Sequence, residues 1–280
     1  MKAARFDYLR PASVDEAVAA LAAGEGMAKA MGGGQSLGPM LNLRLAQPAQ
    51  LVDLRAIAAL RDCTSLPDAE VLGAGVTHAA IEDGKVPDPS RGLMPWVARG
   101  IAYRAVRNRG TLGGSLAHAD PAADWISVMA VLDATCIVAG AAGTRRVAQP
   151  DWMLGAFTTA LADDEVLAAV SIPRLGPAAR WSYYKVNRKT GEFAEAIAAF
   201  VADPARGVCR AVIGAVDGPP HVVGDAAALA AALAAGHGED LAETELRAAG
   251  LLPGNYEYQV HAVALRRAAL ALAEFKEPHP

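Results

Sequence analysis

The chain has 280 residues, of which 53% are hydrophobic and 20% charged. This composition excludes a disordered chain and allows one large domain or roughly two to three smaller ones. The net charge of −4, without a basic block, argues against a nucleic-acid-binding protein.

The three cysteines stand alone in the sequence, so by themselves they cannot hold zinc or an iron–sulfur cluster. We therefore expect reduced thiols and no metal site. The sequence begins without an apolar signal region and has no run of about 18 uncharged apolar residues. We expect a soluble, cytoplasmic protein without a membrane span.

The first part of the chain shows a helix start and then a β–α–β pattern. A capping box begins at Ser13, and apolar residues follow at helical spacing until Gly24 ends the helix. A strand at 27–31, a helix at 36–44 and a strand at 51–54 are expected next. These elements predict a small first domain, residues 1–55.

The middle part, residues 56–175, combines helices with strands. We expect a strand at 70–75, an amphipathic helix at 93–102 and a helix at 124–132 with one apolar face. Strands at 135–139 and 165–172 complete this domain, and 175–179 is the expected linker.

The last part, residues 176–280, begins with three strand patterns that predict an antiparallel meander. They lie at 181–186, 194–201 and 209–216, and two or three helices follow, among them 226–235 and 260–275. The sequence thus predicts an α+β protein in three parts, with a C-terminal antiparallel sheet plus helices.

Two glycine-rich loops are the most informative motifs. Gly32-Gly33-Gly34-Gln35-Ser36-Leu37 and Thr111-Leu112-Gly113-Gly114-Ser115 have the composition that lets backbone N–H groups close on a phosphate. We expect a side chain at Gly33 or Gly114 to intrude on that phosphate and to demand an unfavourable backbone angle. Neither loop matches GxGxxG, and the chain has no Walker A loop, so a Rossmann or P-loop site is not predicted.

An ordered set of motifs around these loops resembles a known family. The set comprises the first glycine loop, the turn at 73–77, the RNxGTxGGS loop at 107–115, Asp120-Pro121 with Asp124, and Tyr184-Lys185. It resembles the FAD-binding medium subunit of the molybdenum hydroxylases, a family that includes carbon monoxide, xanthine and N-heterocycle dehydrogenases. The resemblance implies a PCMH/vanillyl-alcohol-oxidase-like fold with FAD between the first two domains and the third domain closing over it.

The resemblance also assigns cofactor-binding residues, and it assigns no catalytic or metal-binding ones. Neither loop contains a His or Cys that could form a flavin linkage, so FAD is expected to be non-covalent. The assigned positions are Ala30, Met31, Gly32, Gly33, Gly34, Gln35, Ser36, Leu37, Thr77, Ile101, Thr111, Leu112, Gly113, Gly114, Ser115, Asp124, Leu167, Lys185 and Phe193.

Several of these assignments have structural alternatives. Asp124 either accepts a ribityl or ribose hydroxyl proton or stabilises a helix start. Lys185 either adds positive charge beside the nucleotide or is an exposed strand lysine, while Ile101 and Leu167 either sandwich the adenine or belong to the core. Trp181, Tyr183, Tyr184 and Phe193 are candidates for a ring against the isoalloxazine, and His78 and His118 are expected to be structural.

The implied function is electron transfer inside a larger complex. In the family, a large molybdopterin subunit transforms the substrate, a small subunit with [2Fe–2S] clusters relays electrons, and the FAD of the medium subunit passes them to an external acceptor. We expect this role, in a dimer of heterotrimers. A self-sufficient FAD oxidase and a nucleotide-binding assembly module without turnover remain the alternatives.

Overall fold

The first sheet is parallel, with the strand order β1–β3–β2. In the computed structural model, which describes residues 2–275, its elements are β1 (Asp7–Leu9), α1 (Val14–Ala23), β2 (Ala28–Met31), α2 (Leu37–Asn42) and β3 (Gln50–Asp53). The predicted β–α–β unit is therefore present. Helix α2 ends before the predicted boundary, and Arg44 adopts a positive φ of 59°.

The middle sheet is antiparallel, with the order β4–β5–β10–β6–β7. Its strands are β4 (Cys63–Ser65), β5 (Ala69–Gly73), β6 (Thr135–Gly140), β7 (Gly143–Ala148) and β10 (Val166–Pro173), and a small ribbon pairs β8 (Met153–Gly155) with β9 (Thr158–Thr159). The helices between β5 and β6 are α3 (His78–Glu82), α4 (Leu93–Arg99), α5 (Arg104–Arg107), α6 (Leu112–His118) and α7 (Asp124–Leu132). Short 3₁₀ turns occupy Leu54–Ala56, Ala58–Arg61 and Gln149–Asp151.

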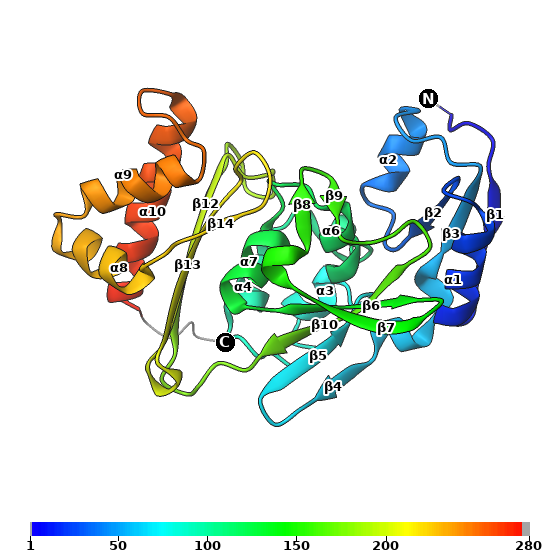
Figure 1. Ribbon diagram of the computed structural model, residues 1–280, viewed down its shortest axis with the longest axis horizontal. Coiled ribbons are helices and arrows are strands. Elements are labelled where there is room, and N and C mark those ends of the chain that lie inside the picture. Colours follow the sequence, from blue (N-terminus) through cyan, green and yellow to red (C-terminus); the bar gives the residue numbers. More distant parts are fainter. Residues whose placement is uncertain (1, 276–280) are drawn as a thin grey trace.

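The third sheet confirms the predicted antiparallel meander. It comprises β11 (Arg180–Val186), β12 (Ala196–Asp203), β13 (Val208–Gly214) and the short β14 (His221–Val222), with a 3₁₀ turn at Pro204–Arg206. Helices α8 (Ala226–Ala235), α9 (Glu239–Ala248) and α10 (Tyr256–Ala273) follow, and α8 and α10 pack on one face of this sheet (Figure 1). Side chains of β12 alternate between the core beneath these helices and the core shared with the middle sheet.

Helix α7 joins the middle and third sheets. It packs against β10 on one side and against β12 and β13 on the other, between the two sheets in Figure 1. The sequence predicts one apolar face, but all nine residues of the helix are buried. A helix that is covered on every side is apolar all round, which explains why periodicity alone underestimates its burial.

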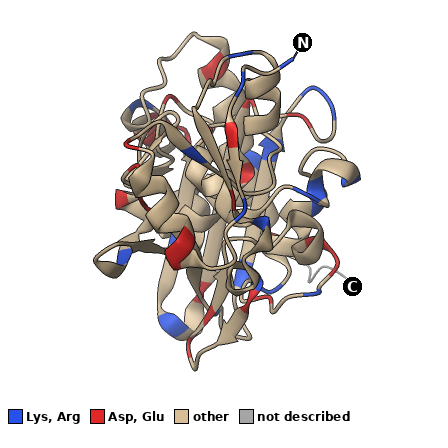
Figure 2. Ribbon diagram, turned by 90° about the vertical axis from the view of Figure 1, so that its right-hand side faces the viewer, with Lys and Arg blue, Asp and Glu red and all other residues tan. Residues whose placement is uncertain are grey.

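No helix within residues 2–275 is long and apolar enough to cross a membrane. In the view of Figure 2, basic and acidic residues are intermixed along the ribbon. The two glycine-rich segments come from different units of the fold. One follows β2 of the first sheet, and the other begins α6 among the helices of the middle sheet.

Candidate cofactor-binding site

The two glycine loops touch each other through their backbones. A Cβ on Gly33 would overlap the carbonyl oxygen of Arg109 and lie 2.8 Å from the Cα of Gly110. A Cβ on Gly32 would lie 3.1 Å from Oγ1 of Thr111 and 3.8 Å from the Cα of Gly114. Segments about eighty residues apart in the sequence thus form a single surface.

The structure revises the reason for glycine at two of these positions. The positive φ lies at Gly34, at 71°, rather than at Gly33 or Gly114. At Gly33 a side chain would strike the second loop, and at Gly114 it would lie 2.7 Å from Oγ1 of Thr111. Glycine is therefore required here by protein packing, before any ligand is considered.

The two loops differ in their unused hydrogen-bond donors. Within residues 2–275, the backbone N–H groups of Gly33, Gly34, Gln35 and Ser36 have no acceptor. In the second loop, the N–H groups of residues 112–115 already have protein acceptors. Leu112 and Gly113 donate to the carbonyls of Val76 and Ala74, both at 2.9 Å. Gly114 and Ser115 donate to Oγ1 and to the carbonyl of Thr111, both at 3.0 Å. Of the two loops, the first thus has the consecutive free backbone donors that an anion-binding segment requires.

Thr77 and Thr111 sit side by side and cap two helices. They form an isolated antiparallel bridge, and the His78 N–H donates to the carbonyl of Gly110 at 3.0 Å. Oγ1 of Thr77 accepts from the N–H of Ala80 at 3.1 Å to begin α3, and Thr111 begins α6 in the same way. The N-termini of both helices are therefore held together beside the first loop.

His78, next to this bridge, is a buried, neutral histidine. Its Nδ1 accepts a hydrogen bond of 3.0 Å from Nε1 of Trp125, so the Nδ1 atom carries no proton. Burial, aided by the charge of Arg107, lowers the pKa of His78 to about 4. The expected structural role of His78 agrees with this geometry.

Asp124 and Lys185, predicted separately, form one buried ion pair. Asp124 is the first residue of α7, and its two carboxylate oxygens lie 2.9 and 3.2 Å from Nζ of Lys185 on β11. Tyr183 donates to the same carboxylate at 2.7 Å, and burial together with this carboxylate raises the pKa of Tyr183. Lys185 is therefore not an exposed strand lysine, and the pair links the middle and third sheets.

The remaining predicted residues are spread around this centre. Ile101 is half-buried in the turn before α5, and Leu167 is a core residue of β10; both belong to the same apolar cluster. Phe193 is 63% exposed, so its ring is open to a ligand or partner. Trp181 and Tyr183 are buried against Trp96 instead.

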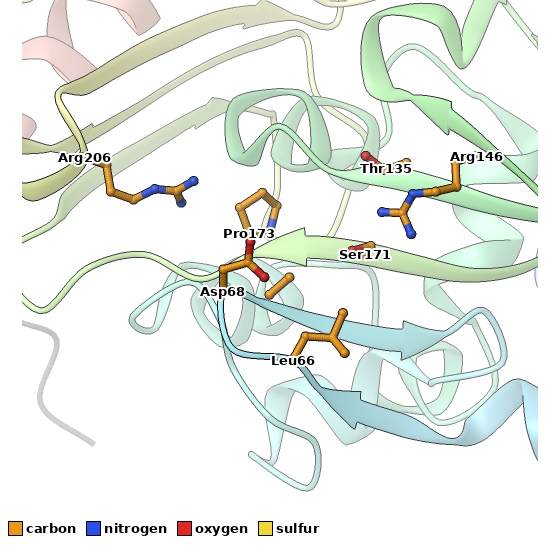
Figure 3. Close-up of a pocket in the computed structure, with 8 residues that line it drawn as sticks. Leu66, Asp68, Thr135, Arg146, Ser171, Pro173 and Arg206 are labelled. Atoms are coloured by element: carbon orange, nitrogen blue, oxygen red, sulfur yellow. The ribbon is translucent and has the colours of Figure 1, made fainter.

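A hollow of about 220 Å³ lies on the middle sheet, at the end that is farther from the Thr77–Thr111 bridge (Figure 3). It is lined at the Pro173 end of β10, whereas the register places Gly73, which leads to the Thr77 bridge, opposite Ala169 nearer the start of that strand. The hollow falls below the range of about 300–1,000 Å³ typical of cofactor pockets. It is therefore not the dinucleotide site.

Comparison with known proteins identifies the family of this chain. A model of the FAD-binding domain in molybdopterin dehydrogenase matches residues 4–175. This chain belongs to that family. The carbon monoxide dehydrogenase medium chain of Hydrogenophaga pseudoflava is 36% identical over 197 residues, 70% of this chain and 69% of that protein.

Two further relatives extend the match over the C-terminal part. The nicotine 6-hydroxylase medium subunit of Paenarthrobacter nicotinovorans is 35% identical over 229 residues, 81% of this chain and 80% of that protein. A chain of quinoline 2-oxidoreductase from Pseudomonas putida 86 has a TM-score of 0.85 at 34% identity and covers 98% of this chain and 99% of its own. The predicted family, α+β fold, oxidoreductase class and FAD cofactor are confirmed.

The residues present fit FAD. The first loop offers four backbone donors without acceptors, a match for the negative charge of a diphosphate. Thr111 and Gly114 add a wall of small residues beside those donors. Since His78 is buried and hydrogen-bonded, and neither loop contains His or Cys, no side chain here is placed to form a flavin linkage.

Gly33→Ala tests the contact between the loops. Because its Cβ would overlap the Arg109 carbonyl, we expect the free energy of unfolding to fall by about 1–3 kcal/mol and the affinity for FAD to fall with it. Gly38→Ala is the matched control, since a Cβ there has open space within α2 and should stabilise the helix slightly. Urea denaturation and FAD titration of both variants measure the difference; equal behaviour would contradict the contact.

His78→Gln tests the buried neutral histidine. The unfolded chain gains a proton near the ordinary pKa of 6.5 while the folded chain resists until about 4, so stability falls as the pH drops through this window. We expect a loss of about 3 kcal/mol across it. Gln retains an acceptor for Trp125 but does not titrate, so the loss should shrink, whereas His237→Gln at an exposed site should keep it. Urea denaturation at about pH 7 and about pH 4 measures this loss; an equal loss of unfolding free energy in His78→Gln and the wild type would contradict it.

Proposed function

We propose that this chain is the FAD-carrying electron-transfer subunit of a multi-subunit molybdenum hydroxylase. It would take electrons from [2Fe–2S] clusters of a partner subunit and pass them to an external acceptor. The observation that carries this proposal is the row of unused backbone donors at 33–36, packed against a second glycine loop, in a chain of the FAD-binding family.

The pyrophosphate of FAD would lie on the first loop. Four consecutive backbone N–H groups lie there without acceptors among residues 2–275, and Ser36 adds a hydroxyl group that makes no cap hydrogen bond. Second-loop residues would form the opposing wall, with Thr77 and Thr111 holding its shape. We assign the sequence-predicted set from Ala30 to Leu37 and from Thr111 to Ser115 to this grip.

Asp124 and Lys185 would serve the flavin part of the cofactor as a pair. Lys185 offsets the charge of Asp124 and orients its buried carboxylate. Its oxygens could still accept a hydroxyl proton, because each carboxylate oxygen has more than one acceptor site. Ile101, Leu167 and Phe193 complete the proposed contacts, the last through its exposed ring.

We infer that the division into residues 1–55, 56–175 and 176–280 corresponds to three functional parts, with the third covering the flavin. Support comes from the Asp124–Lys185 pair, which ties the third sheet to the middle one beside the glycine loops. We also infer a cytoplasmic location, in keeping with three cysteines that form no disulfide.

Partner subunits would supply the clusters and the molybdenum centre. Within residues 2–275, no group of three or more His, Cys, Asp or Glu side chains could hold a metal ion. Two of the relatives named above are a medium chain and a medium subunit. We therefore propose a small [2Fe–2S] subunit and a large molybdopterin subunit as partners, in a dimer of heterotrimers.

Bound FAD would supply the chemistry of accepting electrons singly and releasing them singly or as a hydride. The residues of this chain would do the rest. Backbone donors at 33–36 would orient the diphosphate, and the Asp124–Lys185 pair would fix a charged acceptor. The backbone N–H of His78, bonded to the Gly110 carbonyl, keeps the two helix N-termini together.

Co-expression with the partner subunits tests this function. We expect one non-covalent FAD per chain, released by acid and identified by mass, and a flavin that bleaches when the substrate of the complex is added. The chain alone should be reduced by dithionite but stay inert toward the organic substrate. FMN or no chromophore in the complex, or substrate oxidation by the chain alone, would contradict the proposal.

A further inference from the structure

Arg107 is a buried cation beside the cofactor site that the proposed function leaves unused. Only 9% of the residue is exposed. One edge of its guanidinium donates to Glu82, from Nε at 2.7 Å and from Nη2 at 3.0 Å. The remaining donor, Nη1, reaches the carbonyls of Ile101 at 2.9 Å and Ala102 at 3.0 Å. The planar guanidinium thus joins a carboxylate to two backbone carbonyls.

The two carbonyls belong to a strained turn. Ala102 has a φ of 43°, in the left-handed region that alanine rarely adopts. The turn pairs with Gly191: Ile101 forms a parallel bridge with it, and the Ala102 N–H donates to its carbonyl at 3.1 Å. Gly191 has a φ of 90°, and a Cβ there would lie 2.7 Å from the Ala102 carbonyl oxygen. The contact between Ala102 and Gly191 therefore requires the left-handed backbone of Ala102 and the absence of a side chain at Gly191.

Gly191 lies in the segment between β11 and β12, which we call the 187–195 connection. Three links hold this segment and its flank on the middle unit. They are the Ala102–Gly191 hydrogen bond, a 3.3 Å bond from the Ala194 N–H to the Ala122 carbonyl, and the Asp124–Lys185 pair immediately before the connection. Arg107 stabilises the first link, because its Nη1 donates to the carbonyls of Ile101 and Ala102.

The same guanidinium also holds the frame of the glycine loops. Glu82 ends α3, the helix that Thr77 begins, and Arg107 ends α5, which leads through Gly110 to Thr111. Thr77 and Thr111 form the bridge beside the first loop. The Arg107–Glu82 pair therefore fixes both the helices that shape the phosphate end and the turn that receives the 187–195 connection.

We propose that Arg107 is a positioning residue for the cofactor site, and that it docks the 187–195 connection, with Phe193, beside the flavin by fixing the Ile101–Ala102 turn. This inference rests on the proposed function for the identity of the cofactor. A lysine cannot replace it, because a compact ammonium cannot span the carboxylate and two carbonyls at once.

Arg107→Lys in the FAD-loaded chain tests the proposal. Lysine keeps a positive charge opposite Glu82, so the frame of the glycine loops is retained and we expect one FAD per chain. Amides of the 187–195 connection should exchange hydrogen about tenfold faster, which corresponds to about 1.4 kcal/mol. The visible-region circular dichroism of the bound flavin should change, a signal that a merely structural loss of stability would leave unaltered.

Two further variants make the test specific. Arg104→Lys is the matched control, because Arg104 binds the same Glu82 from a side chain that is 46% exposed and touches neither carbonyl. It should leave exchange and dichroism unchanged. Gly191→Ala breaks the contact from the other side with Arg107 intact, and it should reproduce both changes, with no further effect in the double variant.

The outcomes separate the two proposals. A wild-type chain without FAD would refute the proposed function. FAD-loaded wild type together with an Arg107→Lys variant whose exchange and dichroism match those of Arg104→Lys would overturn the positioning role alone. If Arg107→Lys does not fold, Gly191→Ala still decides: unchanged dichroism and exchange in that variant would also overturn the role.

Discussion

The close approach of two backbones at Gly33 is the constraint on which the site depends. The first glycine loop can lie against the carbonyl of Arg109 only because no side chain intervenes. This contact sets the loop beside α6, and the N–H groups at 33–36 have no acceptor in the described part of the chain. The N–H groups at 112–115 of the second loop already donate to Val76, Ala74 and Thr111. This loop therefore positions the first loop, and its residues 112–115 have no backbone donor left for a phosphate.

A second constraint is the buried helix α7. Because the helix is enclosed by the middle and third sheets, its first residue, Asp124, can meet Lys185 of β11 in the interior. Three contacts hold the third sheet against the unit that carries the second loop. They are the Asp124–Lys185 pair, the Ala102–Gly191 hydrogen bond and the core cluster that contains both Leu167 and Val201. The two ends of the proposed cofactor site thus share one packed core, in which a displacement at one end is felt at the other.

Much of the fold could be predicted because its signals are local. Helix α7 has the predicted bounds, and the meander of the third sheet follows from three apolar strands separated by turns. Strands β1 and β7 were missed, since their residues are mostly exposed and lack an alternating apolar pattern. The resemblance to the family rests on ordered motifs and did not need the fold.

The interactions that define the site could not be predicted in the same way. Asp124 and Lys185 were each selected, but 61 residues separate them, and only the packing of α7 shows that they bind each other. His78 follows the Gly73 turn at a helix start, which was a usable signal, yet its neutral state depends on Trp125, 47 residues away. The partner that makes Gly33 indispensable is a carbonyl group, which carries no signature in the sequence.

The central claim is that the backbone donors at 33–36 hold the diphosphate of FAD. Amide hydrogen exchange with and without FAD tests it most directly, because it reports each N–H group. The amides of Gly33, Gly34, Gln35 and Ser36 should exchange rapidly in the free chain and slowly with FAD, while those of Leu112, Gly113 and Ser115 should be protected in both states. Unchanged exchange at 33–36 in a chain that has bound stoichiometric FAD would contradict the account.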